Sequence, residues 1–435
     1  MRVQAWGQGV LSPLVMVDFR RLLGGTVLWW QCFHMEMVVL GWLVFDLNNS
    51  PLTVSLVSFC RTLPLLLMGL FSGPIIDYFG RRRVVIAAQC ANLCAYLAMV
   101  ALLWSGAAAP WNIAIVAFCL GTAWSIDWPT RRALLPDILG KTKMVDGMLI
   151  ESFLTGLARI IGPLIAGGLI ARFGAVGCYA VMALLSVTAL AVMIPLLHAP
   201  IKRTTQPFKV APWVALGEGL RYVRSNQAIL AVLIVTLIMN MWIFPYVSLL
   251  PVFARDVLHR GPVELGLLGT ATGMGSFIGL LLVNLLLRRY NIGALFVAGT
   301  GWVCIGLFVF ALSRHYSFSW TTLFFAGMGM SCFGTLQSAI ILLRTSDEMR
   351  SRVMGILVLA IGGDPLGQLQ IGSLAERFGV QATLAGQASV AALALVLIIW
   401  RLPGILQPEK QEDLNFVPEQ APHKQPRVDA RTELG

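Results

Sequence analysis

Two oppositely charged residues lie inside long apolar runs near the start of the sequence. Glu36 stands in the run 22–46, and Arg61 stands in the run 52–77. If the chain turns just after Asn48, two antiparallel helices that rise about 1.5 Å per residue bring both charges to the same depth. This spacing predicts an ion pair. The pair is either a permanent link between two helices or a switch that keeps Glu36 ionised until its partner moves away.

The polar residues next to Glu36 cannot all share its face. His34 precedes Glu36 by two residues and therefore lies about 200° around a helix, so the two side chains cannot enter one cavity. Gln31 shares the face of His34. We favour Glu36 as the residue that lines an aqueous cavity, and the alternative for His34 is a packed, hydrogen-bonded side chain.

Two further polar sets recur at helical spacing within apolar runs. Glu151, Thr155 and Arg159 follow one another every four residues, and Asp364 and Gln368 form a similar pair. Residues four apart lie on one face of a helix. Such a stripe either lines a cavity or binds to itself as a structural ladder. We favour cavity lining, because an ionisable group inside a membrane costs several kcal/mol unless it is paired or solvated.

The second half of the chain offers further groups that could contact a ligand. Asn240 and Gln337 add amides within apolar runs, although simple interhelical hydrogen bonds explain them equally well. Trp242, Phe244 and Tyr246 would suit a large, partly aromatic ligand. Tryptophans at the ends of apolar runs are more often interfacial anchors, so only these three aromatic residues are counted among the possible ligand contacts.

The composition indicates which elements must position these groups. Of the 435 residues, 57% are hydrophobic and only 12% are charged, and the mean hydropathy is +0.78. About a quarter of a soluble globular chain is charged, so a soluble protein could not cover this much apolar surface. Apolar runs of about 20 residues span a bilayer as helices. We predict an all-α integral membrane protein with twelve spans, at 22–46, 52–77, 83–105, 111–130, 144–171, 175–197, 227–253, 262–287, 292–312, 318–343, 353–375 and 379–401.

The Lys and Arg residues are distributed unevenly between the two sides of these spans. The chain carries 32 of them and a net charge of +11. Twenty-five fall on the side that holds both termini, and five fall on the opposite side. Because positive residues remain cytoplasmic, both termini are predicted to lie inside the cell. The basic charge therefore reflects membrane topology and not nucleic-acid binding.

The spans fall into two groups of six. The octamer Gly-Gly-Leu-Ile-Ala-Arg-Phe-Gly at 167–174 recurs as Gly-Ser-Leu-Ala-Glu-Arg-Phe-Gly at 372–379, at equivalent positions of the two groups. This repeat favours two similar six-helix bundles. The connector between them has the spacing of an amphipathic helix on the inner membrane face, and the polar tail predicts disorder. The predicted units are an N-terminal bundle (1–197), a connector (198–226), a C-terminal bundle (227–402) and a tail (403–435).

A charged block separates the second span from the third. It reads Gly73-Pro-Ile-Ile-Asp77-Tyr78-Phe79-Gly80-Arg81-Arg82-Arg83. It resembles the cytoplasmic loop signature of the major facilitator superfamily, Gly-x-x-x-Asp-Arg-x-Gly-Arg-Arg. The matching positions are Gly73, Asp77, Gly80, Arg81 and Arg82, and Tyr78 replaces the usual arginine.

Other segments are similar to the branch of this superfamily that holds enterobactin exporters and macrolide-efflux proteins. They are Pro129-Thr-Arg-Arg-Ala-Leu-Leu-Pro-Asp137, Ala158-Arg-Ile-Ile-Gly-Pro163, Leu250-Pro-Val-Phe-Ala-Arg-Asp256 and Arg350-Ser-Arg-Val-Met-Gly355. The resemblance covers residues 18–402 and implies the major facilitator fold. It implies the fold but not the substrate.

The resemblance also implies a cytoplasmic gate. In it, Asp77 and the pair Arg81 and Arg82 would latch onto a carboxylate of the fourth span, Asp127. Arg131 stands one turn after Asp127, so the alternative is a local ion pair between residues four apart. We favour the latch, with Arg131 as a member of the gate.

The fifth span partly resembles the Gly/Pro signature of major facilitator antiporters. The residues are Gly162, Pro163 and Gly167. Glycine permits close helix approach, and proline removes a backbone hydrogen bond. The segment is therefore predicted either to act as a hinge or to form a merely structural kink.

These features together predict a secondary transporter of a bacterial inner membrane. No Gly-x-x-x-x-Gly-Lys-Ser/Thr phosphate loop occurs, so neither ATP nor an enzymatic activity is expected, and we expect no cofactor and no metal. The predicted function is proton-driven export of an amphipathic small molecule, a drug or a siderophore-like metabolite, with Glu36, Asp364 and Arg61 as the proton-coupling candidates. The alternatives are an importer of a nutrient or metal chelate, and a non-transporting sensor or assembly protein on the same scaffold.

Overall fold

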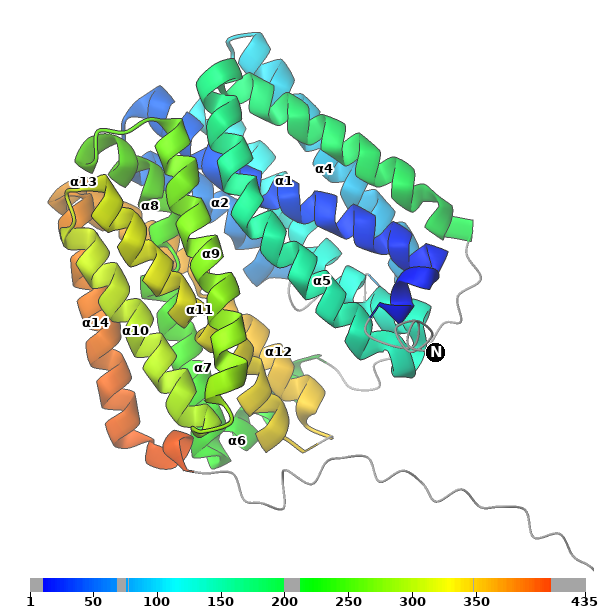
Figure 1. The fold of residues 1–435 in the computed structure, drawn as a ribbon, viewed down its shortest axis with the longest axis vertical. Coiled ribbons are helices and arrows are strands. Elements are labelled where there is room, and N and C mark those ends of the chain that lie inside the picture. Colours follow the sequence, from blue (N-terminus) through cyan, green and yellow to red (C-terminus); the bar gives the residue numbers. More distant parts are fainter. Residues whose placement is uncertain (1–10, 69–75, 77, 199–211, 347, 408–435) are drawn as a thin grey trace, which may run out of the picture.

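The computed structural model describes residues 11–68, 76, 78–198, 212–346 and 348–407. Within these ranges the regular elements are all helical, and none of the described residues forms a strand. Figure 1 shows the helices in two groups, which we call the N half and the C half. The N half contains η2 (Ser12–Val15), α1 (Val17–Asn48), α2 (Pro51–Met68), α4 (Arg81–Trp104), α5 (Pro110–Met193) and η3 (Ile194–His198).

The C half follows the connector helix α6 (Pro212–Ser225). Its helices are α7 (Gln227–Ile238), η4 (Met239–Ile243), α8 (Tyr246–Val252), η5 (Phe253–Val257), α9 (Pro262–Leu286), α10 (Ile292–Leu312), α11 (Tyr316–Arg344), α12 (Arg350–Ile361), α13 (Asp364–Phe378), α14 (Val380–Arg401) and η6 (Pro403–Leu406). Several of these segments join into longer spans. Residues 227–257 form one continuous apolar span, and residues 352–378 form another.

Glycines divide the 84-residue α5 into separate membrane crossings. Gly140 and Gly174 both have φ 68° and are the non-helical residues within it. This left-handed conformation costs glycine little because it has no Cβ. In the part of the chain that the structure describes, eleven helices are long and apolar enough to cross a membrane, and one of them runs over 55 residues from Lys143 to Leu197. That length corresponds to about 80 Å of helix against a hydrocarbon core of about 30 Å. The break at Gly174 thus makes two crossings of it, in agreement with the twelve predicted spans.

A tight turn joins α1 to α2 where the sequence predicts it. Asn49 adopts a left-handed conformation with φ 49°, and its N–H donates to the Phe45 carbonyl. The Asn48 amide donates to Thr53 Oγ1 at 2.8 Å, and Pro51 opens α2. Asparagine tolerates positive φ, and proline suits the first turn of a helix. The two helices therefore run antiparallel from a well-defined corner.

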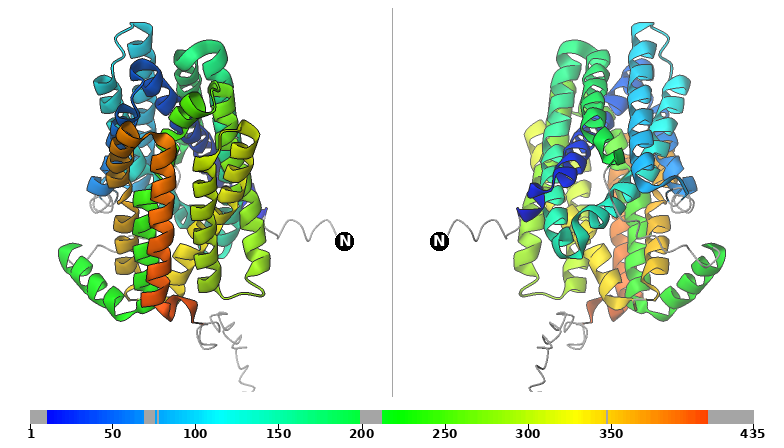
Figure 2. Two further views of the ribbon diagram at one scale, coloured as in Figure 1. Left: turned by 90° about the vertical axis from the view of Figure 1, so that its left-hand side faces the viewer. Right: turned by 90° about the vertical axis from the view of Figure 1, so that its right-hand side faces the viewer.

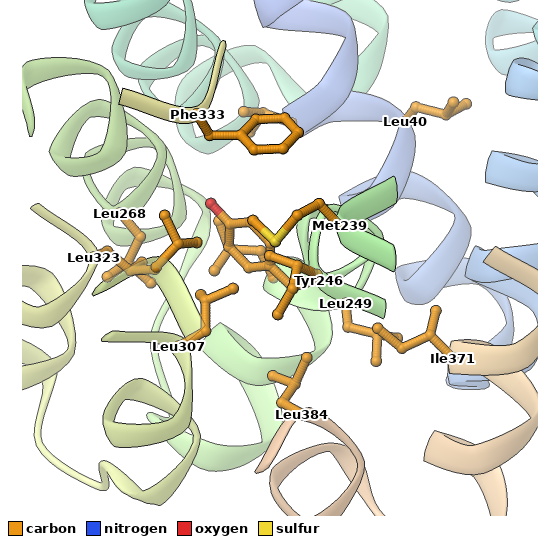
Figure 3. Packing of buried hydrophobic residues seen from close by; sticks show 14 of the residues in the cluster. Leu40, Met239, Tyr246, Leu249, Leu268, Leu307, Leu323, Phe333, Ile371 and Leu384 are labelled. Carbon is orange, nitrogen blue, oxygen red and sulfur yellow. The ribbon is translucent and has the colours of Figure 1, made fainter. Parts of the chain in front are cut away.

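Apolar side chains fill both halves and continue across the contact between them. Figure 3 shows Met239, Tyr246 and Leu249 of the C half packed together, with Leu40 of α1 and Ile371 of α13 nearby. A smaller cluster in the N half gathers Phe19, Leu22, Val85, Leu134, Met193 and their neighbours.

The two halves meet most closely at the end of the molecule where α1 turns into α2, which we call the distal end. There Gly41 of α1 faces Pro251 of α8, and Gly372 of α13 faces Ser55 of α2. Polar contacts join the halves at the same end: Arg255 pairs with Asp46 at 3.0 Å, and Glu376 accepts hydrogen bonds from Ser50 Oγ at 3.0 Å and from the Leu52 N–H at 3.2 Å. In Figure 1 the helices of the two halves approach each other toward the top and diverge toward the bottom.

The connector contains the predicted helix. Arg352 of α12 forms an ion pair with Glu218 of α6 at 2.6 Å, and Gly219 lies close to Ile356. The helix α6 is thus attached to the C half (Figure 2). Its position on a membrane face stays a prediction, and so do the exact limits of the four units. The tail beyond residue 407 lies outside the described residues.

Candidate functional site

Glu36 and Arg61 form the ion pair that their spacing predicts. Arg61 Nε donates to Glu36 Oε1 at 2.7 Å, and Arg61 Nη2 donates to Glu36 Oε2 at 2.9 Å. Glu36 is 1% exposed and Arg61 is 3% exposed. The guanidinium also lies over the rings of Phe33 and Trp124, at 5.5 and 5.7 Å. Two parallel charge-assisted hydrogen bonds are the strongest arrangement open to such a pair.

In the described conformation Glu36 is enclosed within the N half, and a cavity-lining role for it stays a prediction. Its carboxylate points into the N half, where it interacts electrostatically with Tyr96, Tyr179 and Cys32. The bidentate bond to Arg61 holds it there. The opposite face of α1 then turns toward α5 and the C half, and His34 occupies that face.

Arg159 lies where α1, α5 and the C half come together. Its backbone oxygen faces Gly273 of α9. Its guanidinium interacts electrostatically with His34 of α1 and with Tyr246 of α8. Although it stands in the middle of a span, the side chain is exposed, with more than a third of its surface accessible. Neighbours in both halves place this accessible surface between the halves and not toward lipid.

The other members of the predicted stripe have different neighbours. Glu151 interacts electrostatically with Arg131 and Arg132, two turns from Arg159. Thr155 donates to the Ser152 carbonyl of its own helix at 3.2 Å. The stripe therefore joins two environments, and a cavity-lining role for Glu151 and Thr155 stays a prediction.

Asp364 lies at the contact between α13 and α2. It is half-buried at the start of α13 and accepts hydrogen bonds from Gln368, at 3.4 Å to each oxygen, and from Thr62 of the N half. No cation pairs with it among the described residues. Gln368 is 6% exposed, and its Oε1 has no partner in the described part of the chain.

The two amides predicted in the C half both form a hydrogen bond with Thr236. Asn240 donates to the Thr236 carbonyl at 2.8 Å, and Gln337 donates to Thr236 Oγ1. Both are buried within the C half; the Gln337 bond joins α11 to α7, as the interhelical alternative expects, whereas the Asn240 bond stays within its own span. Tyr246 is buried, and its hydroxyl lies 3.5 Å from Thr272 Oγ1. Trp242 is half-buried. A role for them in binding is untested.

The loop signature contributes a different ion pair from the predicted one. Gly73 and Asp77 lie outside the described residues. Gly80 starts α4 with φ 84°, and Arg81 Nη1 pairs with Asp137 Oδ2 at 2.8 Å. Arg82 borders a small apolar pocket with Val85, Ile86, Leu134, Ile138, Met193 and Leu196.

The carboxylate next to Arg81 is therefore Asp137 and not Asp127. Asp127 pairs with Arg131 at 2.8 Å, one turn along the same helix, as the local alternative expects. The pairing follows from position, because Asp137 lies near Gly140, at the end of its helix, where α4 begins, whereas Asp127 is fully buried. Asp137 is in one of the family-like segments, but its type and spacing alone gave no signal for this role.

Arg131 connects four segments of the N half. It donates to Gln89 Oε1 at 3.0 Å and to Thr26 Oγ1 at 3.3 Å, and it lies 5.2 Å from the Trp29 ring. Gln89 in turn donates to Ser186 Oγ at 2.8 Å. Sequence reasoning missed these partners, because single amides and hydroxyls in apolar runs carry no periodic signal.

The segment predicted as a hinge forms the contact between the halves. A Cβ on Gly167 would lie 2.5 Å from the Pro262 carbonyl oxygen, and one on Gly266 would lie 2.4 Å from the Pro163 oxygen. Gly162 packs equally closely on His34. The backbone keeps helical φ and ψ angles through Pro163, and the choice between a hinge and a structural kink stays a prediction. Small residues here allow two helix backbones to touch.

We expect Gly167→Leu to prevent closure of the distal end, because its side chain would collide with backbone atoms of α9. Gly168→Leu is the matched control, since no atom lies within 4 Å of a Cβ at Gly168. Labelling of a Ser55→Cys thiol by a membrane-impermeant maleimide, corrected for the parent chain, measures distal opening. Labelling should rise about tenfold or more with Gly167→Leu. Equal labelling of both leucine variants would contradict the prediction.

Comparison with known proteins identifies the family of this chain. A family model described as transmembrane secretion effector, a class of major facilitator transporters, matches residues 8–432. The chain belongs to this family. Members and relatives of the family are transporters and not enzymes.

Three relatives show the range of the family. The staphyloferrin A transporter of Staphylococcus aureus (strain NCTC 8325 / PS 47) is 24% identical over 345 residues, which cover 79% of this chain and 86% of the relative. The multidrug efflux pump Tap of Mycolicibacterium fortuitum is 24% identical over 409 residues, covering 92% and 97%. Macrolide efflux protein A of Streptococcus pyogenes is 22% identical over 356 residues, covering 80% and 86%.

Solved structures confirm the fold. The crystal structure of the nucleoside transporter NupG superposes with a TM-score of 0.71 at 14% identity, over 88% of this chain and 99% of that chain. A bacterial homologue of the human lysosomal transporter Spinster gives a TM-score of 0.65 at 12% identity, over 90% and 96%. The predicted major facilitator fold is thus confirmed.

Proposed function

We propose that this member of the transmembrane secretion effector family exports an amphipathic small molecule across a bacterial inner membrane in exchange for protons, by alternating access of the two halves. The observation that carries the proposal is the position of Arg159 and Asp364. Both lie where the halves meet, and the halves approach each other most closely at one end only. With both termini cytoplasmic, the conformation described would be open toward the cytoplasm.

Asp364 is the stronger proton-coupling candidate of the two carboxylates. The charge of Glu36 is fully compensated by Arg61 inside the N half. Among the described residues Asp364 has only neutral partners, and one of them, Thr62, belongs to the other half. A proton on Asp364 would therefore remove an uncompensated charge without breaking an ion pair. Its partner across the contact links protonation to the relative position of the halves.

Transport by the purified chain in inside-out proteoliposomes tests the proposal. The probes are three fluorescent amphiphiles of one size: dansylglycine, which is anionic, neutral dansylglycinamide and cationic dansylethylenediamine. An acidic lumen should drive at least one probe into the vesicles, and a protonophore should abolish its accumulation. Accumulation that ignores the pH gradient would contradict proton coupling. No movement of any probe would contradict export of this class of compound.

A further inference from the structure

Arg159 is a cation without a counter-ion among the described residues. Within the described residues its guanidinium has no carboxylate partner, and its electrostatic neighbours are His34 and Tyr246. The buried arginines of the N half differ in this respect, since Arg61 and Arg131 both form close ion pairs. An unpaired charge at this depth is costly, and such residues mark pathways of ions or substrates.

In the described part of the chain, two hydrogen-bond donors near Arg159 lack an acceptor. The Nε2 atoms of Gln31 and His34 are buried and have no partner among the described residues. Both residues pack on the next turn of α5: a Cβ on Gly162 would lie 2.7 Å from His34 Cβ and 3.4 Å from the Gln31 carbonyl oxygen. Buried donors are nearly always satisfied in folded proteins. Two buried donors without a partner, next to the accessible Arg159 guanidinium on α5, call for an acceptor that the described residues do not supply.

The surroundings of these donors are aromatic. The Trp30 ring stacks on His34 with centroids 5.6 Å apart and an interplanar angle of 21°. These rings would contact an apolar body, while the donors would contact an anionic head.

We propose that the transported molecule is an organic anion with an apolar or aromatic body, and that its carboxylate, or an equivalent anionic oxygen group, binds Arg159 and accepts hydrogen bonds from Gln31 and His34. This inference rests on the proposed function and names its substrate class. Guanidinium groups bind carboxylates through two parallel hydrogen bonds. The bound anion would supply both the missing charge and the missing acceptors.

Binding of the same three dansyl probes to the chain in nanodiscs tests the inference. Dansylglycine should bind at least about tenfold more tightly than dansylglycinamide, as expected for one charge-assisted hydrogen-bonded contact. Arg159→Gln should reduce this ratio to about one. Arg159→Lys should retain part of it, because a lysine keeps the charge and loses the planar fork. Arg314→Gln removes an exposed charge far along the chain and should leave the ratio unchanged.

The outcomes separate this inference from the proposed function. If dansylglycine fails to bind, or if its preference survives Arg159→Gln, the inference is overturned. Proton-driven transport of the neutral or cationic probe without preference for the anion overturns the inference and supports the proposed function. Carboxylate-selective binding without any transport supports the inference and contradicts the proposed function. Elution of each variant as a monodisperse peak confirms that a lost preference does not reflect misfolding.

Discussion

Asp364→Asn should reduce transport driven by a pH gradient by about tenfold or more. Asparagine keeps the size of the side chain and can still bond to Thr62 and Gln368, but it cannot exchange a proton. Exchange of labelled for unlabelled probe at equal pH should persist, because this exchange needs no net proton movement. The two assays in the same proteoliposomes separate loss of coupling from loss of binding.

The matched controls for this experiment are two other acidic residues. Asp256→Asn removes an exposed carboxylate of η5 and should transport like the wild type. Glu36→Gln tests the second candidate in the same assay. Gradient-driven transport at the wild-type rate in Asp364→Asn would contradict the proton-coupling role of Asp364. A loss of gradient-driven transport in Glu36→Gln alone would assign that role to Glu36.

Arg61→Met should be the most destabilising single substitution in the N half. It leaves Glu36 at 1% exposure without its partner. Removing one member of a buried ion pair costs about 3–5 kcal/mol, because the remaining charge stays buried and uncompensated. Thermal unfolding in detergent should therefore begin at a clearly lower temperature than in the wild type.

The double variant Glu36→Gln/Arg61→Met identifies the cause of the stability loss expected in Arg61→Met. It removes both charges and should recover most of the lost stability, since the isolated charge is then gone. Arg255→Met serves as the comparison for an accessible pair, because Arg255 and Asp46 are 36% and 59% exposed in their side chains. Accessible pairs contribute about 1 kcal/mol or less. No recovery in the double variant would show that Arg61 stabilises the N half by packing on Phe33 and Trp124 instead.

The sequence predicts most of the fold because the membrane imposes a simple rule on it. Long apolar runs must be helices, and this rule placed the spans and the turn after Asn48. Helical geometry also predicted the contact of Glu36 with Arg61, since depth follows from residue number. It could not decide which way Glu36 points, because rotation about the helix axis depends on the partner. The bidentate bond to Arg61 settles that rotation.

Contacts between distant helices were the part that sequence could not supply. Arg81 reaches Asp137, and Arg131 reaches Gln89, across helices whose relative rotation no periodicity fixes. The distal contact of Glu376 with Ser50 joins residues 326 positions apart. The sequence predicts that the glycines of α5 permit close helix approach. In the structure the same glycines allow backbone contact with α9, which depends on the residues opposite them.

The ion pairs inside the N half have an electrical consequence for the proposed cycle. Glu36 with Arg61, and Asp127 with Arg131, are neutral units that move no net charge when the halves rearrange. The charge displaced per turnover is then set by the proton on Asp364 and by the anion on Arg159. Export of a monovalent anion against one entering proton moves two charges in the same electrical sense. At about 2.3 kcal/mol per charge for each 100 mV, the membrane voltage itself would contribute to the driving force.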